Sequence, residues 1–320
     1  KVYKGQRVLA TGNSGFKGAW LTIFLKELGA EVIGYSDKIK WKNSIFNNEN
    51  IKSINHYWAD IRDYEKLEKV VLLEKPDLIF HLAAQPLVIE SYKNPFDTFT
   101  TNMNGTLNIL NIVYKKLPNT PIVIITSDKV YSNENKNKNF SELSLLNGSC
   151  PYSTSKAVCE MLANSYSNLS KKIKIRTVRA GNVIGGGDWS DNRIIPDLVK
   201  AIKLHKELIL RNPKHTRPWS YVLDIVYGYL LVGLELFNSQ VSFDTYNLAP
   251  INKNSKSVLD ITREFLKHFN HKEIKINITN NNIFQEKEKL SLNTNKIRNN
   301  INWHNRVSFE GFIEKTAFWY

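Results

Sequence analysis

The chain has 320 residues, 42% of them hydrophobic and 23% charged, which is typical of a folded protein with a sizeable core. No apolar run reaches the roughly 18–20 residues that span a bilayer, and two cysteines, Cys150 and Cys159, cannot form a disulfide framework. These features exclude a secreted, membrane-spanning or fibrous protein and indicate a cytoplasmic one.

The 44 basic and 30 acidic residues give a formal net charge of +14. That charge suits a polyanionic partner, either nucleic acid or a phosphate-bearing small molecule. The lysines are nevertheless spread along the chain and do not gather in one stripe. Scattered lysines are typical of a solvated surface, so we expect neither a nucleic-acid nor a membrane partner.

Strand and helix patterns alternate in the first half of the chain. Short runs of β-branched and apolar residues predict strands at Arg7–Thr11, Glu31–Tyr35, Asp77–Leu82, Pro121–Thr126 and Ile173–Val178. Helical patterns lie between them, at Gly15–Gly29, Tyr64–Leu73, Thr101–Leu117 and from Tyr152 onward. The alternation predicts an α/β protein with a Rossmann-like, doubly wound parallel sheet.

The pattern is looser after Arg179. A helix at Val222–Phe237 and a strand at Tyr246–Leu248 are expected to return to the sheet, followed by a helix at Ser257–Phe269 and a surface loop at Asn277–Gln285. We therefore expect a sheet domain at residues 1–178, with 220–248 returning to it. Residues 179–320 would form a smaller C-terminal α/β substrate lobe over the carboxyl ends of the strands.

A glycine-rich turn joins the first strand to the first helix. Gly12 permits a tight turn, Gly15 lets the backbone approach a pyrophosphate, and Gly18 lets helix and strand pack closely. The alternative is a purely structural strand-to-helix turn, but the position between strand and helix favours a dinucleotide site. The expected cofactor contacts are Gly12, Asn13, Ser14, Gly15, Phe16 and Gly18.

Two further acidic residues, Asp37 and Asp60, are candidates for cofactor contacts. Asp37 is placed to accept a hydrogen bond from the adenosine ribose 2′-hydroxyl, which favours NAD over NADP, although Ser36 and Lys38 could accommodate a phosphate. Asp60 and Ile61 are candidates for the adenine contact, or else form an ordinary surface turn.

Tyr152 and Lys156 are four residues apart, on one face of a predicted helix. A phenol is a poor base near neutral pH, and a neighbouring ammonium favours its phenolate. Lys156 could also hold the cofactor ribose. The pair therefore suggests a catalytic base that also contacts the cofactor.

These motifs resemble the extended short-chain dehydrogenase/reductase family. Further segments are similar to its CDP-glucose 4,6-dehydratase subfamily, and the likeness covers nearly the whole chain: His81–Val88, Thr126–Tyr131, Arg179–Trp189, Arg211–Pro213 and Arg217–Trp219. The resemblance implies NAD as cofactor and CDP-glucose as substrate. The product would be CDP-4-keto-6-deoxyglucose, for surface polysaccharide synthesis.

Ser127, Asp128 and Lys129 follow a buried strand, so they are expected beside the nicotinamide. An oxidation needs only the hydroxyl, whereas an elimination needs a second acid/base pair. Tyr152 would take the 4-hydroxyl proton during oxidation, Lys129 the C5 proton, and Asp128 would protonate the departing 6-hydroxyl. The stored hydride would then return to C6. If Lys129 stays protonated, the roles of Asp128 and Lys129 are exchanged; a simple salt bridge is the structural alternative.

The resemblance also assigns residues that contact ligands. Leu82, Ala83, Ala84 and Asn102 are expected at the cofactor, and Gln85 and Glu286 at the substrate. Asn182, Arg193, Arg211 and Arg217 are candidates for the substrate diphosphate, since arginine binds phosphate in a bidentate manner. Any one of these arginines could instead be structural. His81, within an apolar strand, is expected to be a core residue, and no metal site is expected.

Assembly and substrate are less constrained by the sequence. The helices at Thr101–Leu117 and Tyr152–Ser170 carry apolar residues on more than one face, which implies a homodimer built on a four-helix bundle, as in the family. The segment Ser132–Cys150 is shorter than usual in that subfamily. The alternatives are a 4-epimerase, a 4,6-dehydratase of a GDP-, UDP- or dTDP-sugar, or a non-enzymatic nucleotide-binding module.

Overall fold

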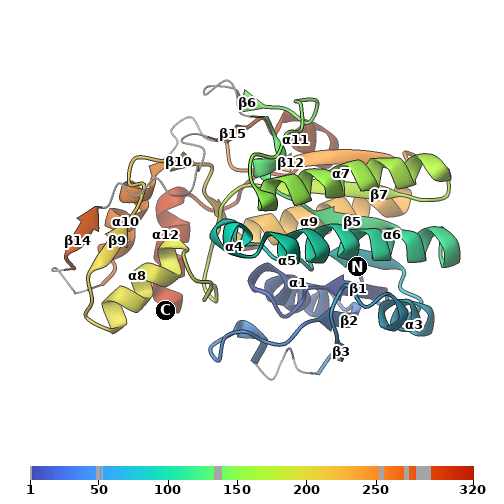
Figure 1. Cartoon of the computed structure of the whole chain (residues 1–320), viewed down its shortest axis with the longest axis horizontal. Helices are drawn as coiled ribbons and strands as arrows, with labels where there is room; N and C mark the ends of the chain where they lie inside the picture. Colours follow the sequence, from blue (N-terminus) through green and yellow to red (C-terminus); the bar gives the residue numbers. More distant parts are fainter. Residues whose placement is uncertain are drawn as a thin grey trace.

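Seven parallel strands form the central sheet, in the order β12–β7–β5–β4–β1–β2–β3 (Figure 1). The computed structural model describes residues 2–47, 51, 53–132, 139–251, 256–269, 274–278 and 290–320. The strands span β1 Arg7–Thr11, β2 Glu31–Ser36, β3 Asn55–Trp58, β4 Leu78–His81, β5 Ile122–Ile125, β7 Ile175–Ala180 and β12 Phe243–Leu248. This order is that of a doubly wound dinucleotide-binding sheet with one further strand, so the predicted fold class is confirmed.

Helices cover both faces of the sheet (Figure 1). One face carries α1 (Phe16–Glu27), α9 (Val222–Asn238) and α11 (Asn295–Ile301), and the other carries α3 (Tyr64–Glu74), α6 (Gly105–Lys116) and α7 (Pro151–Leu169). Successive strand side chains point to opposite faces. Val8 accordingly packs in the α1–α9 core and Leu9 in the α3–α6–α7 core. Burial on both faces explains the nearly unbroken apolar run of β5.

The helical segment before β5 begins earlier than the sequence predicts. Helix α4 (Val88–Lys93) is followed by α5 (Pro95–Phe99), with proline in its first turn, and by a π-helical turn at Thr100–Asn104 that leads into α6. Proline suits the start of a helix because its missing N–H has no partner there. The continuous helical stretch therefore begins at Pro95, so the start predicted at Thr101 is wrong by six residues.

The C-terminal lobe has a separate hydrophobic core. It contains Leu198, Phe265 and Ile313, together with Trp219. Its elements are α8 Ile194–Lys203, β9 Leu208–Leu210, β10 Thr216–Arg217, β13 Lys256–Ser257, α10 Val258–Leu266, β14 Ile276–Ile278 and α12 Phe309–Trp319. The sheet and this lobe occupy opposite sides of Figure 1.

Strand β14 corrects the surface loop expected from Asn277. It pairs in parallel with β9, and Ile274 and Ile276 pack against the core of the lobe. The alternation of Ile274, Ile276 and Ile278 is a strand signal, which the neighbouring asparagines obscure. The remainder of that predicted loop, and Glu286, lie outside the described residues.

Two short strand pairs lie near the carboxyl edge of the sheet. Strand β8 (Val183–Ile184) pairs with β11 (Ser220–Tyr221), and β6 (Asn139–Phe140) pairs with β15 (Ser291–Leu292). Within the described ranges, no helix is both long and apolar enough to cross a membrane.

Candidate active site

A cavity of about 260 Å³ lies between the carboxyl edge of the sheet and the C-terminal lobe. The sheet contributes the residues after β5 and β7, because parallel strands all end at the same edge. The lobe contributes Arg193, the strand β9 and the segment after it. The sequence-predicted residues that line the cavity are Ser127, Asp128, Lys129, Tyr152, Asn182, Arg193, Arg211 and Arg217.

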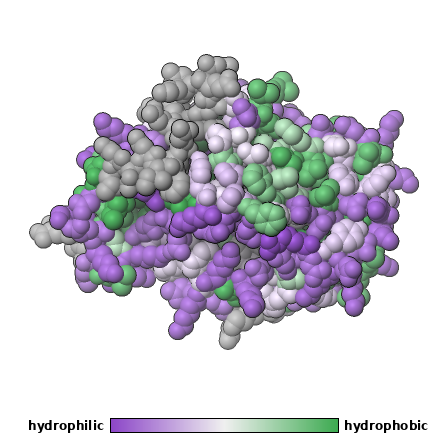
Figure 2. All heavy atoms as spheres, in the orientation of Figure 1, coloured by the Kyte–Doolittle hydropathy of each residue, from purple (hydrophilic) through white to green (hydrophobic). Residues whose placement is uncertain are grey.

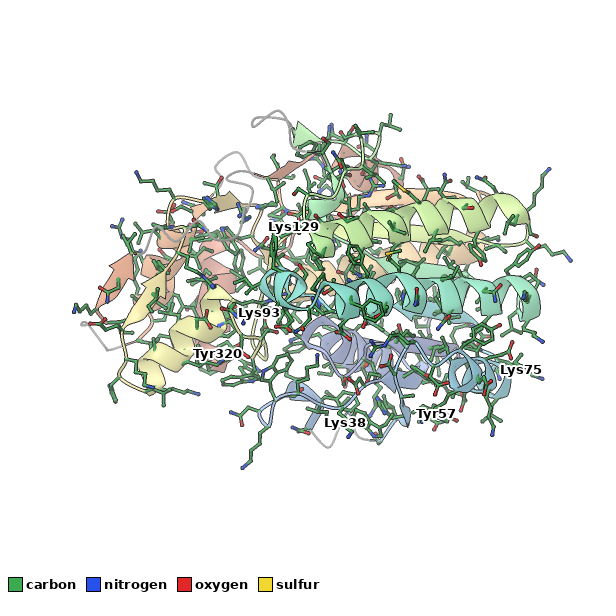
Figure 3. All side chains as sticks on the ribbon, in the orientation of Figure 1. Lys38, Tyr57, Lys75, Lys93, Lys129 and Tyr320 are labelled. Carbon is green, nitrogen blue, oxygen red and sulfur yellow. The ribbon has the colours of Figure 1, made fainter. Side chains whose placement is uncertain are left out.

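Ser127, Asp128 and Lys129 form a tight turn after β5. Ser127 caps the 3-10 turn Asp128–Val130: its Oγ accepts a hydrogen bond from Lys129 N and donates one to Asp128 Oδ1, both at 3.2 Å. Asp128 is 1% exposed, and its Oδ2 has no hydrogen-bond partner in the described part of the chain. Lys129 lies between the sheet and the lobe (Figure 3). The turn therefore directs an acid and an amine into one cavity.

Tyr152 and Lys156 lie on α7, beside this turn. Burial raises the pKa of Tyr152 to about 12, although a hydrogen bond with Ser127 and the charge of Arg193 act in the opposite direction. Lys156 is 6% exposed, and its Nζ donates to the Ile125 carbonyl at 3.0 Å. Burial lowers the pKa of Lys156. Lys156 thus bonds to the backbone of β5, and the stabilisation of a Tyr152 phenolate by Lys156 stays a prediction.

The glycine-rich turn has the geometry that its sequence predicts. Gly12 has a φ of +71°, and a Cβ there would lie 2.6 Å from Ala83 N. A Cβ on Gly18 would lie 2.2 Å from the Gly12 carbonyl oxygen, so both positions require glycine. Gly15 caps α1 without any side-chain hydrogen bond. The first amides of α1 are therefore suited to an anion, and the turn fits a dinucleotide pyrophosphate.

Some residues around this turn lie at the surface, and others are buried. Ser14 Oγ donates to the Asp37 carbonyl at 3.2 Å, and the exposed Asp37 carboxylate accepts a bond from Lys38 N. Both lie beside the glycine turn, as expected. Asn13 is completely buried, and its Oδ1 lies 3.1 Å from His56 Nε2. Its side chain holds β3 and does not reach into the cavity.

The predicted adenine contacts are already engaged within the protein. A guanidinium hydrogen bond from Arg62 lowers the pKa of Asp60, and the two form an ion pair at 2.6 Å. Ile61 is 5% exposed and packs against Gly105 of α6. The Asp60 carboxylate is thus held by Arg62 within the same turn, and Ile61 packs against α6, so the adenine contact stays a prediction.

The segment after β4 divides in the same way. Leu82, Ala83 and Ala84 follow β4 directly and are partly exposed, and Ala83 contacts Gly12. Gln85 and Asn102 are buried: Gln85 Nε2 donates to Thr98 Oγ1 at 2.8 Å, and Asn102 Nδ2 donates to Ser155 Oγ at 2.8 Å. Their side chains brace the turn, while the neighbouring residues Pro86–Ile89 line the cavity.

The three arginines of the lobe differ in their burial and in their polar partners. Arg193 Nη1 lies 3.9 Å from Asp188 Oδ2, and Arg211 Nη1 donates to Asn192 Oδ1 at 3.1 Å. Arg217 is 4% exposed, and its Nη1 donates to the Thr216 carbonyl. All three line the cavity, so they can meet an anionic ligand there.

His81 and Lys17 contrast with each other. His81 is 2% exposed, its ring nitrogens lie 2.8 Å from Thr11 Oγ1 and 3.1 Å from Thr106 Oγ1, and burial lowers its pKa to about 3. It is a core residue, as predicted.

Lys17 and Asp188 line the cavity and are missing from the predicted site. Lys17 lies within the glycine motif itself, which is the signal that could have identified it.

Comparisons with known proteins agree with this geometry. The family model described as GDP-mannose 4,6 dehydratase matches residues 9–316. The chain belongs to this family. It is thus an extended short-chain dehydrogenase/reductase, as the motifs suggest. A CDP-glucose 4,6-dehydratase of Salmonella typhimurium is 34% identical over 99% of this chain and 91% of the relative.

Solved structures support the same fold. The dTDP-glucose 4,6-dehydratase of Bacillus anthracis in complex with NAD has a TM-score of 0.83 and 23% identity, over 99% of this chain and 96% of that one. The UDP-glucose 4-epimerase of Thermotoga maritima with UDP-glucose has a TM-score of 0.84 and 22% identity, over 98% of each chain. Both likenesses concern the fold alone.

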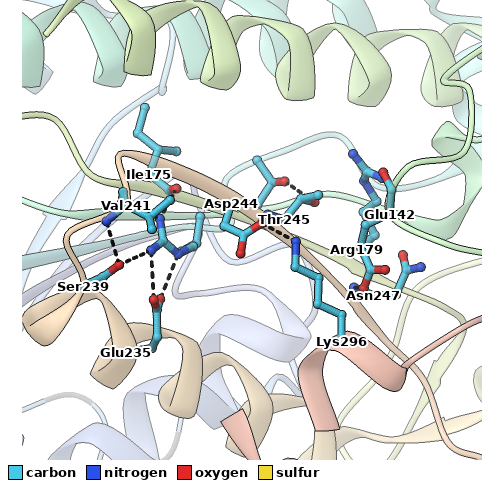
Figure 4. A network of polar contacts seen from close by, with 12 residues as sticks. Glu142, Ile175, Arg179, Glu235, Ser239, Val241, Asp244, Thr245, Asn247 and Lys296 are labelled. Carbon is cyan, nitrogen blue, oxygen red and sulfur yellow. Dashed lines mark hydrogen bonds and ion pairs between the residues drawn. The ribbon is translucent and has the colours of Figure 1, made fainter. Parts of the chain in front are cut away.

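This dehydratase-family chain has a buried carboxylate next to the turn at Ser127–Val130. Glu160 of α7 accepts hydrogen bonds from Thr126 and Thr177, and it forms an ion pair at 3.0 Å with Arg179. Arg179 also donates to Tyr131 Oη at 2.8 Å and to the Glu142 carbonyl at 3.1 Å. Figure 4 shows Arg179 beside Glu142 and Asn247. Nearby, Arg176 similarly pairs with Glu235 at 2.8 Å.

We expect Arg179→Met to destabilise the protein strongly. It leaves the 2%-exposed Glu160 carboxylate without its cation, and breaking a buried ion pair in this way costs about 3–5 kcal/mol. Lys200→Met is the matched control, because it removes an exposed pair with Asp191 worth about 0–1 kcal/mol. Urea unfolding would measure both free energies. Equal losses would contradict a structural role for the buried pair.

Proposed function

We propose that the protein is a CDP-glucose 4,6-dehydratase that uses NAD and serves surface polysaccharide synthesis in the cytoplasm. The observation that carries the proposal is the pair Asp128–Lys129, placed in the same cavity as Tyr152. The identity of 34% to the Salmonella typhimurium enzyme supports the choice of substrate. The free, buried thiols of Cys150 and Cys159 support the compartment.

The proposed cofactor contacts are the glycine turn, Ser14 and Asp37 at one end, and Tyr152 with Lys156 at the other. NAD⁺ supplies a hydride acceptor and, later in the same turnover, a hydride donor. Asp37 beside the turn favours NAD, because a carboxylate accepts a bond from a ribose 2′-hydroxyl and repels a 2′-phosphate. Leu82, Ala83 and Ala84 complete the wall of this site.

Oxidation at C4 requires a base for the 4-hydroxyl proton. Tyr152 Oη is that base in our proposal, and Ser127 Oγ orients the sugar oxygen. Burial raises the pKa of Tyr152 to about 12, and a positively charged nicotinamide and Lys156 beside the phenol would lower it. Lys156 would then exchange its bond with the Ile125 carbonyl for the cofactor ribose.

Water loss requires a second acid and base. The 4-ketone acidifies the C5–H bond, so Lys129 Nζ can remove that proton as a neutral amine, while Asp128 gives its proton to the departing 6-hydroxyl. Lys129 returns its proton to C5 as the hydride reaches C6. Asp128 Oδ2 supports this role, because it is buried in the cavity wall and makes no other hydrogen bond in the described structure.

The substrate diphosphate has candidate partners on the lobe. Asn182, which follows β7, and Arg193, Arg211 and Arg217 of the lobe line the same cavity as Asp128 and Lys129. Paired guanidinium bonds would fix the diphosphate and so hold the hexose over Asp128 and Lys129. Gln85 and Asn102 act by supporting the cavity wall, and Glu286 stays an untested candidate.

A 4-epimerase or a dehydratase of another nucleotide sugar is the alternative function. The epimerase of Thermotoga maritima shares the fold with a TM-score of 0.84. Epimerisation needs Tyr152 but no elimination pair, so the acid and amine in the cavity favour a dehydratase.

The substrate panel is the direct test. Purified protein with NAD⁺ should convert CDP-glucose faster than dTDP-, UDP- or GDP-hexoses, and form the alkali-sensitive 4-keto-6-deoxy chromophore. Tyr152→Phe is the control and should give no product. Formation of a 4-epimer without the chromophore would favour the epimerase, and preference for another nucleotide would correct the substrate.

Oxidation and elimination should separate by mutation. Tyr152→Phe should abolish the reduced-nicotinamide signal on adding substrate, because the phenolate is lost. Lys129→Met keeps the side-chain length, so oxidation should persist while water loss falls by about 10²–10⁴-fold. Reduced cofactor should accumulate, and solvent deuterium should enter C5 more slowly. Near-normal elimination by Lys129→Met would make Lys129 a structural residue.

We also propose a homodimer, formed through helices α6 and α7. The two helices pack side by side, and their inner faces are buried against the sheet. Their outer faces expose Leu107, Tyr114, Met161 and Leu169. Figure 2 shows hydrophobic residues gathered over these helices. Pairing with a second copy would give a four-helix bundle and remove this apolar surface from water.

Light scattering at micromolar concentration should give the mass of a dimer. Met161→Glu, in the middle of the exposed face of α7, should shift the protein to a monomer because it buries a charge at the interface. Leu204→Glu is the matched control, since Leu204 is 59% exposed on the lobe, and it should leave the dimer intact. A monomeric wild type would contradict the proposal.

A further inference from the structure

Lys17 occupies an unusual position for a lysine. It lies in the first turn of α1, two residues after the helix cap Gly15, and its side chain lines the cavity. The same helix end faces the expected pyrophosphate of the cofactor. The roles proposed above leave this lysine without a function.

The amine of Lys17 has one hydrogen bond in the described structure. Its Nζ lies 3.4 Å from Tyr229 Oη and 5.9 Å from the centre of that ring. Within the described residues, no carboxylate lies within ion-pair distance of it. Tyr229 is buried on α9, so the hydrogen-bond partner of the amine is a neutral phenol.

Four charged groups act on Lys17 from other elements. Arg193 of the lobe and Lys156 of α7 repel its charge, while Asp128 after β5 and Asp188 after β8 favour it more weakly. Burial is the largest effect, and together these lower the pKa of Lys17 to about 7. The neutral and charged amines therefore coexist near neutral pH.

We propose that Lys17 binds a diphosphate group in this cavity and takes up a proton as it does so. A diphosphate diester carries two negative charges, which favour the ammonium over the amine. Such a group occurs in both the cofactor and the nucleotide sugar. The inference rests on the proposed function only in requiring that one of these ligands enters the cavity.

The direction of the pH effect follows from this linkage. Below pH 7 Lys17 is already charged, so binding takes up no proton and affinity is highest. Above pH 7 the free protein must first gain a proton, so uptake approaches about one proton and affinity falls. Neither NAD⁺ nor CDP-glucose has a diphosphate group that titrates near pH 7.

Calorimetry in two buffers of different ionisation enthalpy measures the uptake. The full chain, freed of cofactor, would be titrated at pH 6 and pH 8 with NAD⁺ in one arm and CDP-glucose in the other. Lys17→Met should lose the uptake and bind about 10- to 100-fold more weakly at pH 6. Lys17→Arg should keep the affinity without uptake, because a guanidinium stays charged.

The control variant is Lys26→Met, at the other end of α1. Lys26 donates to Ser53 Oγ, away from the cavity, so this variant should behave as wild type. His215 also lines the cavity, so the decisive quantity is the difference between wild type and Lys17→Met. The arm that shows this difference identifies the cofactor or the substrate as the ligand.

Unchanged uptake in Lys17→Met in both arms would overturn the proposal, as would a wild type that binds neither ligand. If Lys17→Arg bound the ligand as weakly as Lys17→Met, the shape of the lysine side chain and not its charge would matter. That result would also overturn the proposal. Proton uptake that depends on Lys17, in a protein that converts no nucleotide hexose, would leave this inference standing and reject the proposed function.

Discussion

Glu160 fixes the catalytic turn to the rest of the protein. Its carboxylate joins β5 through Thr126, β7 through Thr177 and Arg179, and it lies on α7 one helical turn after Lys156. The turn after β5, strand β7 and helix α7 thus share one buried side chain. These partners satisfy both oxygens of the buried carboxylate. The positions of Ser127 and Tyr152 depend on this arrangement.

Burial of the same region sets the charge of the site. Removal of water raises the pKa of Tyr152 and lowers those of Lys156 and Lys17, so all three groups are driven toward their neutral forms. In our proposal, the positive nicotinamide and the negative diphosphates would act against these shifts, and a site that excludes water strengthens each such charge interaction.

The sequence predicted strands β4 and β5 well because both are fully buried and read as apolar runs, whereas β3 is partly exposed and has no such run. Strand β1 matches residue for residue, and the glycine turn follows because its conformation admits no other residue at Gly12. The individual contacts were harder to predict. Nothing in one sequence distinguishes Asn102, whose amide is used by Ser155, from a residue that faces a ligand. Partners distant in the chain decide which way such a side chain turns.

The proposed acid/base residues and the proposed diphosphate contacts lie on differently constrained parts of the protein. Asp128, Lys129 and Tyr152 stand on elements bound to the sheet through Glu160, so their mutual geometry is strongly constrained. Arg211, by contrast, follows a three-residue strand and bonds only to Asn192 in the described structure. A substitution in the lobe can therefore move Arg211 without disturbing Asp128, Lys129 or Tyr152. Such a division of roles allows dehydratases and epimerases to share one fold.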